Sequence, residues 1–274
     1  MRKRNRVKNW LAALLLLFVF TIDSKAENNP DKAQTTKTST EHISTVYQKI
    51  NFCRFNKLNP QVFETAYRGY LNLKGAGKLS DEKEILSVAD YSLSSNVPRL
   101  WIIDLRNNKV LQNTYVAHGQ GTGEEFAEHF SNRENSHQSS LGFYVTGETY
   151  NGGHGLSLYL FGMDNQYNSA AYSRSVVMHG ASYVSESFIQ QNQRLGRSWG
   201  CPAVSEELAP EIINCLKDGT CLFIYHNDKN YLTNSYWLNK KSNQLENEME
   251  KGKFELNLPQ PTVGNEDVQM LSAQ

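Results

Sequence analysis

The pattern of apolar positions along the chain changes near residue 85. Upstream of it, apolar side chains recur every three or four residues over 60–75, which predicts an amphipathic helix. Asn59 supplies an N-cap, Pro60 occupies the first helical position, and glycines follow the last turn. Residues 43–55 carry a weaker pattern of the same kind. We therefore predict a helical segment over residues 41–84 that packs on a larger domain.

Downstream of residue 85, short segments rich in β-branched and aromatic residues alternate with turn residues, which is typical of β-strands. The expected strands cover residues 85–91, 99–105, 109–117, 143–149, 156–161, 176–178 and 221–226. Two helices interrupt them, one that begins near Ser185 and one over 206–217. Many short strands with few helices favour a mostly β domain of the α+β class, which we assign to residues 85–238.

Residues 1–26 have the features of a secretory signal peptide. A basic head precedes an apolar run of 13 residues from Trp10 to Ile22, and small residues lead to a cleavage site after Ala26. The alternative is an uncleaved signal anchor, but a helix that spans a bilayer needs about 20 apolar residues. No cysteine follows the cleavage site as a lipid attachment point. We expect a periplasmic or secreted protein without a stable membrane anchor.

Removing the signal peptide changes the charge of the chain. The full 274 residues contain 28 basic and 28 acidic side chains, whereas 22 basic and 27 acidic ones remain after residue 26, a net charge of −5. This balance argues against a nucleic-acid partner held by bulk electrostatics. Residues 27–40 and 239–274 are polar and lack an apolar period, so we predict a flexible linker and a disordered tail.

One pair of residues has the pattern of a cysteine nucleophile and its base. His179 ends an apolar strand, and Cys201 follows Gly200 ahead of the helix predicted at 206–217. A catalytic cysteine needs a base to accept its proton and backbone N–H groups to hold the developing oxyanion. A helix N-terminus aimed at the sulfur would favour the thiolate further. The alternative is that this cysteine is a free thiol with no catalytic role, which packs as a small buried apolar side chain.

The residues around this pair resemble the L,D-transpeptidase catalytic-domain (YkuD-like) family of cell-wall enzymes, in its branch with a Ser-x-Gly-Cys-Pro signature. The motifs that carry the resemblance are Met178-His179-Gly180 and Ser198-Trp199-Gly200-Cys201-Pro202. The resemblance covers about residues 86–226 and implies a β-sandwich or barrel domain. It also implies Cys201 as nucleophile and His179 as its base. Ser198 and Gly200 would shape the turn, with backbone N–H groups near Gly200 and Cys201 as the oxyanion hole.

The reaction implied by the resemblance is acyl transfer on peptidoglycan stem peptides. Cys201 would attack the carbonyl that joins the third stem residue to D-alanine, and D-alanine would leave with a proton from His179. An amine of a neighbouring stem would then resolve the thioester and form a 3→3 cross-link. The resemblance implies no metal and no other cofactor, and it implies acylation of the cysteine by carbapenems.

Two positions depart from the pattern of the family. The family has His where this chain has Trp199, and Arg or Asn where this chain has Ala203, so substrate contacts of those positions do not carry over. Arginine binds carboxylates bidentately, so nearby arginines are candidates for holding a substrate, with a solvated loop charge as the alternative for each. The candidate substrate-binding residues are His154 in a glycine-rich loop, Arg174, Arg194, Arg197 and Trp199.

Several alternatives stay open at the level of sequence. Water in place of the amine would make the enzyme an L,D-carboxypeptidase or a related thiol amidase, and a wall-binding module without activity is a third function. A zinc site is a further alternative, although no short-spaced zinc motif is present. The candidate ligands are His118, His154 and His179. Cys215 and Cys221 either form a disulfide or are free thiols, and we favour free thiols.

Overall fold

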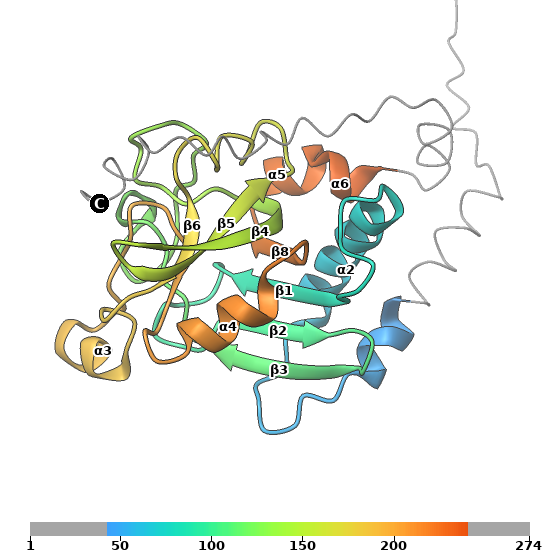
Figure 1. Ribbon diagram of the computed structural model, residues 1–274, viewed down its shortest axis with the longest axis horizontal. Helices are drawn as coiled ribbons and strands as arrows, with labels where there is room; N and C mark the ends of the chain where they lie inside the picture. The colour runs from blue at the N-terminus through green and yellow to red at the C-terminus, as the bar shows by residue number, and fades with distance from the viewer. Residues whose placement is uncertain (1–42, 241–274) are drawn as a thin grey trace, which may run out of the picture. The chain divides into compact units, whose positions relative to one another are not determined.

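The computed structural model describes residues 43–240, which build one eight-stranded sheet with helices on its faces (Figure 1). The strand order in the sheet is β3-β2-β1-β8-β4-β5-β6-β7. The predicted signal peptide at 1–26, the linker at 27–40 and the tail from 241 onward lie outside the described residues.

All seven strands predicted from the sequence are present, with ends that differ by a few residues. The strands are β1 Ile85–Asp90, β2 Leu100–Asp104, β3 Lys109–Thr114, β4 Gly142–Gly152, β5 Gly155–Gly162, β6 Val177–Gly180, β7 Ala203–Val204 and β8 Cys221–Tyr225. Only β7 has no counterpart among the predictions, because a strand of two residues is too short to show a period.

The predicted helices are also present, and two further ones follow the last strand. The helices are α2 Pro60–Gly75, the 3-10 helix η1 Gln120–Thr122, α3 Glu186–Asn192, α4 Ala209–Leu216, α5 Lys229–Asn234 and α6 Tyr236–Asn239. Residues 43–49 form one more helical stretch. The last two helices, of six and four residues, escaped prediction because they are too short to show a helical period, and α6 extends one residue into the predicted tail. Every helix of residues 43–240 is too short or too polar to cross a bilayer.

The sheet curves until its two edges nearly meet. β1 and β8 run parallel at its centre, β6 and β7 are parallel at one edge, and the other pairs are antiparallel. The chain that continues from β3 forms isolated bridges from Ala117 to Ala203 and from Gly119 to Ser198. These bridges connect the two edges, so the predicted mostly β fold with a sandwich or barrel architecture is confirmed.

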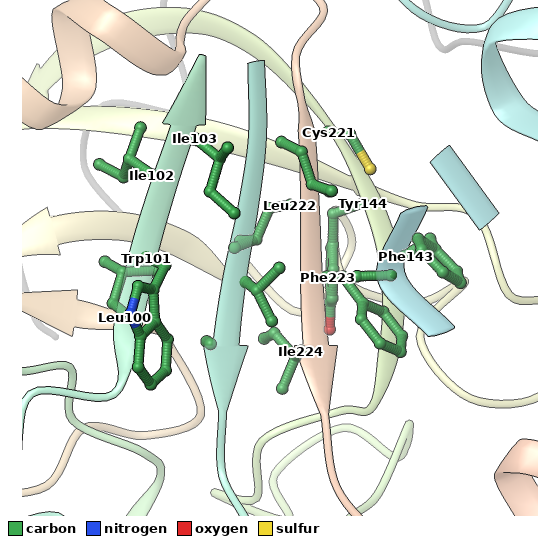
Figure 2. Close-up of a cluster of buried hydrophobic side chains, with 14 of the residues drawn as sticks. Leu100, Trp101, Ile102, Ile103, Phe143, Tyr144, Cys221, Leu222, Phe223 and Ile224 are labelled. Carbon is green, nitrogen blue, oxygen red and sulfur yellow. The ribbon is translucent and has the colours of Figure 1, made fainter. Parts of the chain in front are cut away.

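The central strands form the core of the molecule. Figure 2 shows side chains of β2, β4 and β8 packed together, including Leu100, Phe143 and Phe223. All six residues of β1 are buried, so this strand does not alternate between buried and exposed positions. Such continuous burial is expected of strands covered on both faces. The rings of Phe143 and Phe223 stack with their centroids 4.1 Å apart.

Helix α2 covers one face of this central part. The Asn59 side chain caps it by accepting a hydrogen bond from the Gln61 N–H at 2.8 Å. The helix packs on β1 and β8, and α6 lies beside it (Figure 1). Asn72 of α2 donates a side-chain hydrogen bond of 2.7 Å to the Trp237 carbonyl. The helix and the end of the described chain therefore stabilise each other on the same side of the sheet.

Candidate active site

A pocket of about 270 Å³ lies where β5 and β6 meet the turn that precedes β7. Its wall contains most of the residues singled out from the sequence: Cys201, His179, Ser198, His154, Arg197 and Trp199. Arg194 and Gly200 are not part of this wall. The fold thus brings together residues that are separated by up to 47 positions along the chain.

The thiol of Cys201 is held against strand β6. Its Sγ accepts a hydrogen bond from the Val177 N–H at 3.4 Å and lies 3.7 Å from the Ser175 carbonyl oxygen, to which the S–H donates. Burial raises the pKa of the thiol, while the Val177 N–H and the charge of Arg174 oppose this shift in part. The N–H donor comes from β6, not from the N-terminus of α4. The resting cysteine is therefore a neutral thiol.

His179 is the buried third residue of β6, 3% exposed, and pairs with Ser157 of β5 and Ala203 of β7. Its Nδ1 lies 2.9 Å from the Gly180 carbonyl oxygen. A carbonyl oxygen only accepts, so the proton is on Nδ1 and Nε2 is left with a lone pair. Burial lowers the pKa of His179, the Gly180 hydrogen bond opposes this shift, and His154 adds to it. The imidazole is thus a neutral base.

The turn that carries Cys201 is closed by Ser198. The Ser198 Oγ accepts from the Gly200 N–H at 3.1 Å and donates to the Cys201 carbonyl oxygen at 2.6 Å. Gly200 has φ of +122°, and a Cβ there would lie 2.8 Å from the Gln138 carbonyl oxygen, so only glycine fits. The Gly200 N–H, expected from the sequence to serve the oxyanion hole, is occupied by Ser198 instead.

Ser139 fixes the orientation of the peptide before Cys201. This fully buried serine accepts from the Gly119 N–H at 3.0 Å and donates to the Gly200 carbonyl oxygen at 3.3 Å. The C=O and N–H of a trans peptide point in opposite directions, so the Cys201 N–H points away from Ser139. Among the hydrogen bonds of residues 43–240, none uses that N–H. This N–H is therefore a free donor beside the Cys201 side chain, and no sequence motif marks Ser139.

A buried Arg99 and His118 support the site from behind. Arg99 donates to the carbonyl oxygens of Val116 and Leu93 and lies 2.8 Å from His118 Nδ1. Burial and the Arg99 charge lower the pKa of His118 to about 3, so its ring is neutral. His118 in turn accepts at its carbonyl from the Ser198 N–H at 3.0 Å. The segment that follows β3 therefore holds the turn of Ser198 and Cys201 in place.

This position of His118 bears on the zinc alternative. His118 is 1% exposed and its Nδ1 already accepts from a guanidinium, so it is not available to join His154 and His179 as a ligand. Within residues 43–240, no three His, Cys, Asp or Glu side chains are arranged to hold a metal ion. All four cysteines are free thiols, Cys215 and Cys221 included.

The three candidate arginines have different surroundings. Arg174 donates to the carbonyl oxygens of Ser131 and Gln138, so it anchors the loop before β4, and it does not line the pocket. Arg194 and Arg197 share Glu124, with contacts of 2.8 and 2.6 Å. Arg197 alone of the three lines the pocket. The predictions for Arg174 and Arg194 are therefore not supported by their placement.

Two rings extend the pocket wall. Trp199 is 50% exposed and stacks on His137, with centroids 4.8 Å apart and an interplanar angle of 6°. His154 lies in the turn between β4 and β5 and stacks on His179 at 4.3 Å. Its glycine-rich turn places the exposed imidazole over the buried one. Both residues are in contact range of a ligand that reaches Cys201.

A family model described as the L,D-transpeptidase catalytic domain matches residues 54–225. No curated protein matches the chain.

Among solved structures, the matches include three L,D-transpeptidases. An L,D-transpeptidase from Mycobacterium smegmatis has a TM-score of 0.34 and 11% identity over 53% of this chain and 59% of its own. The LD transpeptidase LdtMt1 in complex with imipenem has a TM-score of 0.32 and 12% identity over 52% of this chain and 59% of its own. An L,D-transpeptidase (Yku) from Stackebrandtia nassauensis has a TM-score of 0.32 and 12% identity, covering 70% and 93%. The chain thus spans 59% of the length of the first two structures.

Proposed function

Because the chain belongs to the L,D-transpeptidase catalytic-domain family, we propose that it is a cysteine L,D-transpeptidase that acts on peptidoglycan stem peptides. The observation that carries the proposal is the convergence of Cys201 and His179 on one pocket. A thiol and an unprotonated Nε2 in the same pocket are the two groups that thiol acyl transfer requires. The free Cys201 N–H adds a donor for the oxyanion.

In the first half-reaction, His179 Nε2 accepts the proton of the Cys201 thiol as the sulfur attacks the carbonyl carbon between the third stem residue and D-alanine. A C–S bond forms, and the Cys201 N–H stabilises the charge on the oxygen. The C–N bond then breaks, and His179 passes its proton to the leaving amine of D-alanine. The products are a thioester on Cys201 and free D-alanine.

In the second half-reaction, the amine of a neighbouring stem attacks the thioester and gives a proton to His179. A new C–N bond forms, the C–S bond breaks, and the proton returns to the sulfur. The Gly180 carbonyl keeps the Nδ1 proton in place throughout, so Nε2 is the nitrogen that exchanges protons. The enzyme ends in its starting protonation state and needs no external base.

Arg197 is the residue that we assign to the carboxylate of the departing D-alanine. Its guanidinium lines the pocket, donates to the carbonyl oxygens of Gln120 and Gly123, and is paired with Glu124. The Arg197 side chain is 19% exposed and that of Glu124 is 71% exposed, so a substrate carboxylate can replace Glu124 while the two carbonyl contacts keep the guanidinium in place. We also propose that carbapenems acylate Cys201, since the solved LdtMt1 structure contains imipenem.

The site of action follows from residues 1–26, which we propose to be a cleaved signal peptide that directs the protein to the periplasm or the exterior. Peptidoglycan lies outside the cytoplasmic membrane, so the proposed location and the proposed substrate are consistent with each other. The test is the N-terminus of the secreted protein, which should be Glu27. A secreted protein that retains residues 1–26 would contradict cleavage.

The reaction is tested by incubating residues 27–274 with disaccharide-tetrapeptide muropeptides and identifying the products by mass. We expect cross-linked dimers and released D-alanine, and a carbapenem adduct on Cys201. Cys201→Ala should give neither, whereas Cys215→Ser, which changes a cysteine outside the pocket, should give both. Tripeptide as the sole product would assign a carboxypeptidase, and turnover by Cys201→Ala would reject the thiol mechanism.

A further inference from the structure

The outer face of strand β5 continues from the pocket as a surface of aromatic rings. Leu158 and Leu160 are fully buried beneath it. The alternate residues Ser157, Tyr159 and Phe161 share the opposite face, because successive side chains of a strand point to opposite sides. Ser157 lines the pocket. The face that begins at the pocket therefore leads along β5 away from Cys201.

Four rings on this face contact one another, and we call them the aromatic row: Tyr150, Tyr159, Tyr172 and Phe161. Tyr150 lines the pocket and stacks on Tyr159 with centroids 4.6 Å apart. Tyr172 lies 5.7 Å from Tyr159 and stacks on Phe161 at 5.4 Å. Three rings are partly buried, and Tyr172 is 41% exposed. The row thus connects the pocket to an open aromatic surface.

The sheet beneath the row is shaped to keep these rings in place. Gly147 of β4 lies under Phe161, and a Cβ at this glycine would come within 2.6 Å of the ring. Register along β4 shifts between Thr146 and Thr149, next to this glycine. Phe161 rests on the backbone, Tyr172 stacks on Phe161, and Tyr172 is therefore the outermost layer. Such preorganised rings lose little conformational entropy when a ligand binds.

The chemistry of the row indicates which ligand it fits. Its members are three tyrosines and a phenylalanine, so it carries no formal charge and does not favour an ionic partner. Aromatic rings offer flat apolar surface, and tyrosine adds a hydroxyl that reaches water or a polar ligand. A pyranose ring has the complementary character, with an apolar C–H face and hydroxyl groups around its rim. Contiguous exposed apolar surface beside a site is typical of a ligand-binding extension.

We propose that the aromatic row binds the glycan strand of peptidoglycan while a stem peptide of that strand occupies the pocket. This proposal rests on the function proposed above and extends it from the peptide to the polymer. The stem is covalently attached to the glycan, so a surface continuous with the pocket meets sugar rings when the stem reaches Cys201. The row would then favour polymeric peptidoglycan over isolated stem peptides.

The test compares Tyr172→Ala, Tyr172→Phe and the control Tyr236→Ala, which removes a tyrosine of similar exposure from α6. Binding is measured by calorimetry with chitohexaose, a neutral N-acetylglucosamine oligomer. We expect Tyr172→Ala to weaken binding three- to tenfold, and both other variants to bind as the unchanged protein does. Retention by Tyr172→Phe assigns the effect to the ring and not to the hydroxyl.

A second readout is kcat/KM on polymeric peptidoglycan divided by kcat/KM on an isolated tetrapeptide. Tyr172→Ala should lower this ratio three- to tenfold. An unchanged ratio together with unchanged chitohexaose binding would overturn the glycan proposal and leave the proposed reaction intact. Chitohexaose binding without turnover of any stem peptide would support glycan binding by the aromatic row and reject the proposed transpeptidase reaction. Self-association lost in Tyr172→Ala, without oligosaccharide binding, would assign the surface to a second copy instead.

Discussion

At the scale of single residues, burial moves the pKa values of Cys201 and His179 in opposite directions, because it disfavours the charged form of each. The thiol keeps its proton and the imidazole lacks one at neutral pH. Many reactive cysteines instead rest as thiolates beside a cation. In the mechanism that we propose, the proton moves from Cys201 to His179 only when a substrate carbonyl is attacked, which would protect the thiol from other electrophiles.

This resting state predicts the pH dependence of Cys201. The rate of alkylation by iodoacetamide should rise with a midpoint above the ordinary thiol value of 9.0, because the pKa is raised. Turnover of stem peptides should fall only below pH 6.5, because the His179 pKa is lowered from 6.5 and protonation removes the base. Mass spectrometry of the Cys201 peptide separates this thiol from Cys53 and Cys215. An alkylation midpoint below pH 8 for Cys201 would contradict a neutral resting state of Cys201 and His179.

Ser139 provides a second prediction at this scale. Ser139→Ala removes the hydrogen bond to the Gly200 carbonyl and frees the peptide that presents the Cys201 N–H. A hydrogen bond of this kind contributes about 0.5–1.5 kcal/mol, so kcat should fall about two- to tenfold with little change in KM. Ser140→Ala is the control, because Ser140 bonds to Ser131 and Arg174 and not to the turn. An increase in KM with an unchanged kcat would reject the positioning role of Ser139.

At the scale of elements, the site depends on how short strands are joined. β6 carries His179 and donates to the Cys201 sulfur, and β7 holds the chain that follows the nucleophile. The segment after β3 pairs with this turn through Gln120, whose N–H donates to the Ser198 carbonyl at 2.8 Å. Three stretches that are distant in sequence therefore set the geometry of one turn.

The packing of α2 on the sheet leads to a prediction for Gly69. Glycine inside a helix is unfavourable relative to alanine by about 1 kcal/mol, so Gly69→Ala would stabilise an isolated helix. In the folded protein the new Cβ would lie 2.0 Å from the buried Phe143 ring. Overpacking costs about 1–3 kcal/mol, so we expect a net loss of stability in urea unfolding. The control is Arg68→Ala on the exposed side of α2, which should change stability by less than about 0.5 kcal/mol. A Gly69→Ala variant that is more stable than the unchanged protein would contradict this packing.

At the scale of the whole molecule, the helical segment and the sheet share one core. The α2 side chains in this core are Val62, Phe63, Ala66, Tyr67, Tyr70 and Leu73. Burial of a large apolar side chain contributes about 1.5–3 kcal/mol, and the total stability of a domain is about 5–15 kcal/mol. Loss of the segment therefore removes a stabilising free energy comparable to the total stability of the domain.

We therefore expect a chain that begins at Ser80 to lose its cooperative thermal transition. Circular dichroism against temperature measures this, with a chain that begins at residue 41 as the control that keeps α2. The control should melt cooperatively. A cooperative transition in the shorter chain would show that the sheet folds without α2 and would contradict the shared core.

Local patterns in the sequence determined the longer helices and every strand except β7, because period and turn residues depend on near neighbours, whereas β7, α5 and α6 are too short to show a period. They also marked Cys201 and His179 as candidates for a cysteine nucleophile and its base, and the structure places both in the wall of one pocket. Ser139, Arg99 and the aromatic row have no such mark, since their roles arise from contacts between distant segments. Only the tertiary structure decided that the Gly200 N–H is occupied, that Arg174 anchors a loop, and that Cys201 is a neutral thiol. These depend on burial and hydrogen-bond partners, which a linear pattern does not specify.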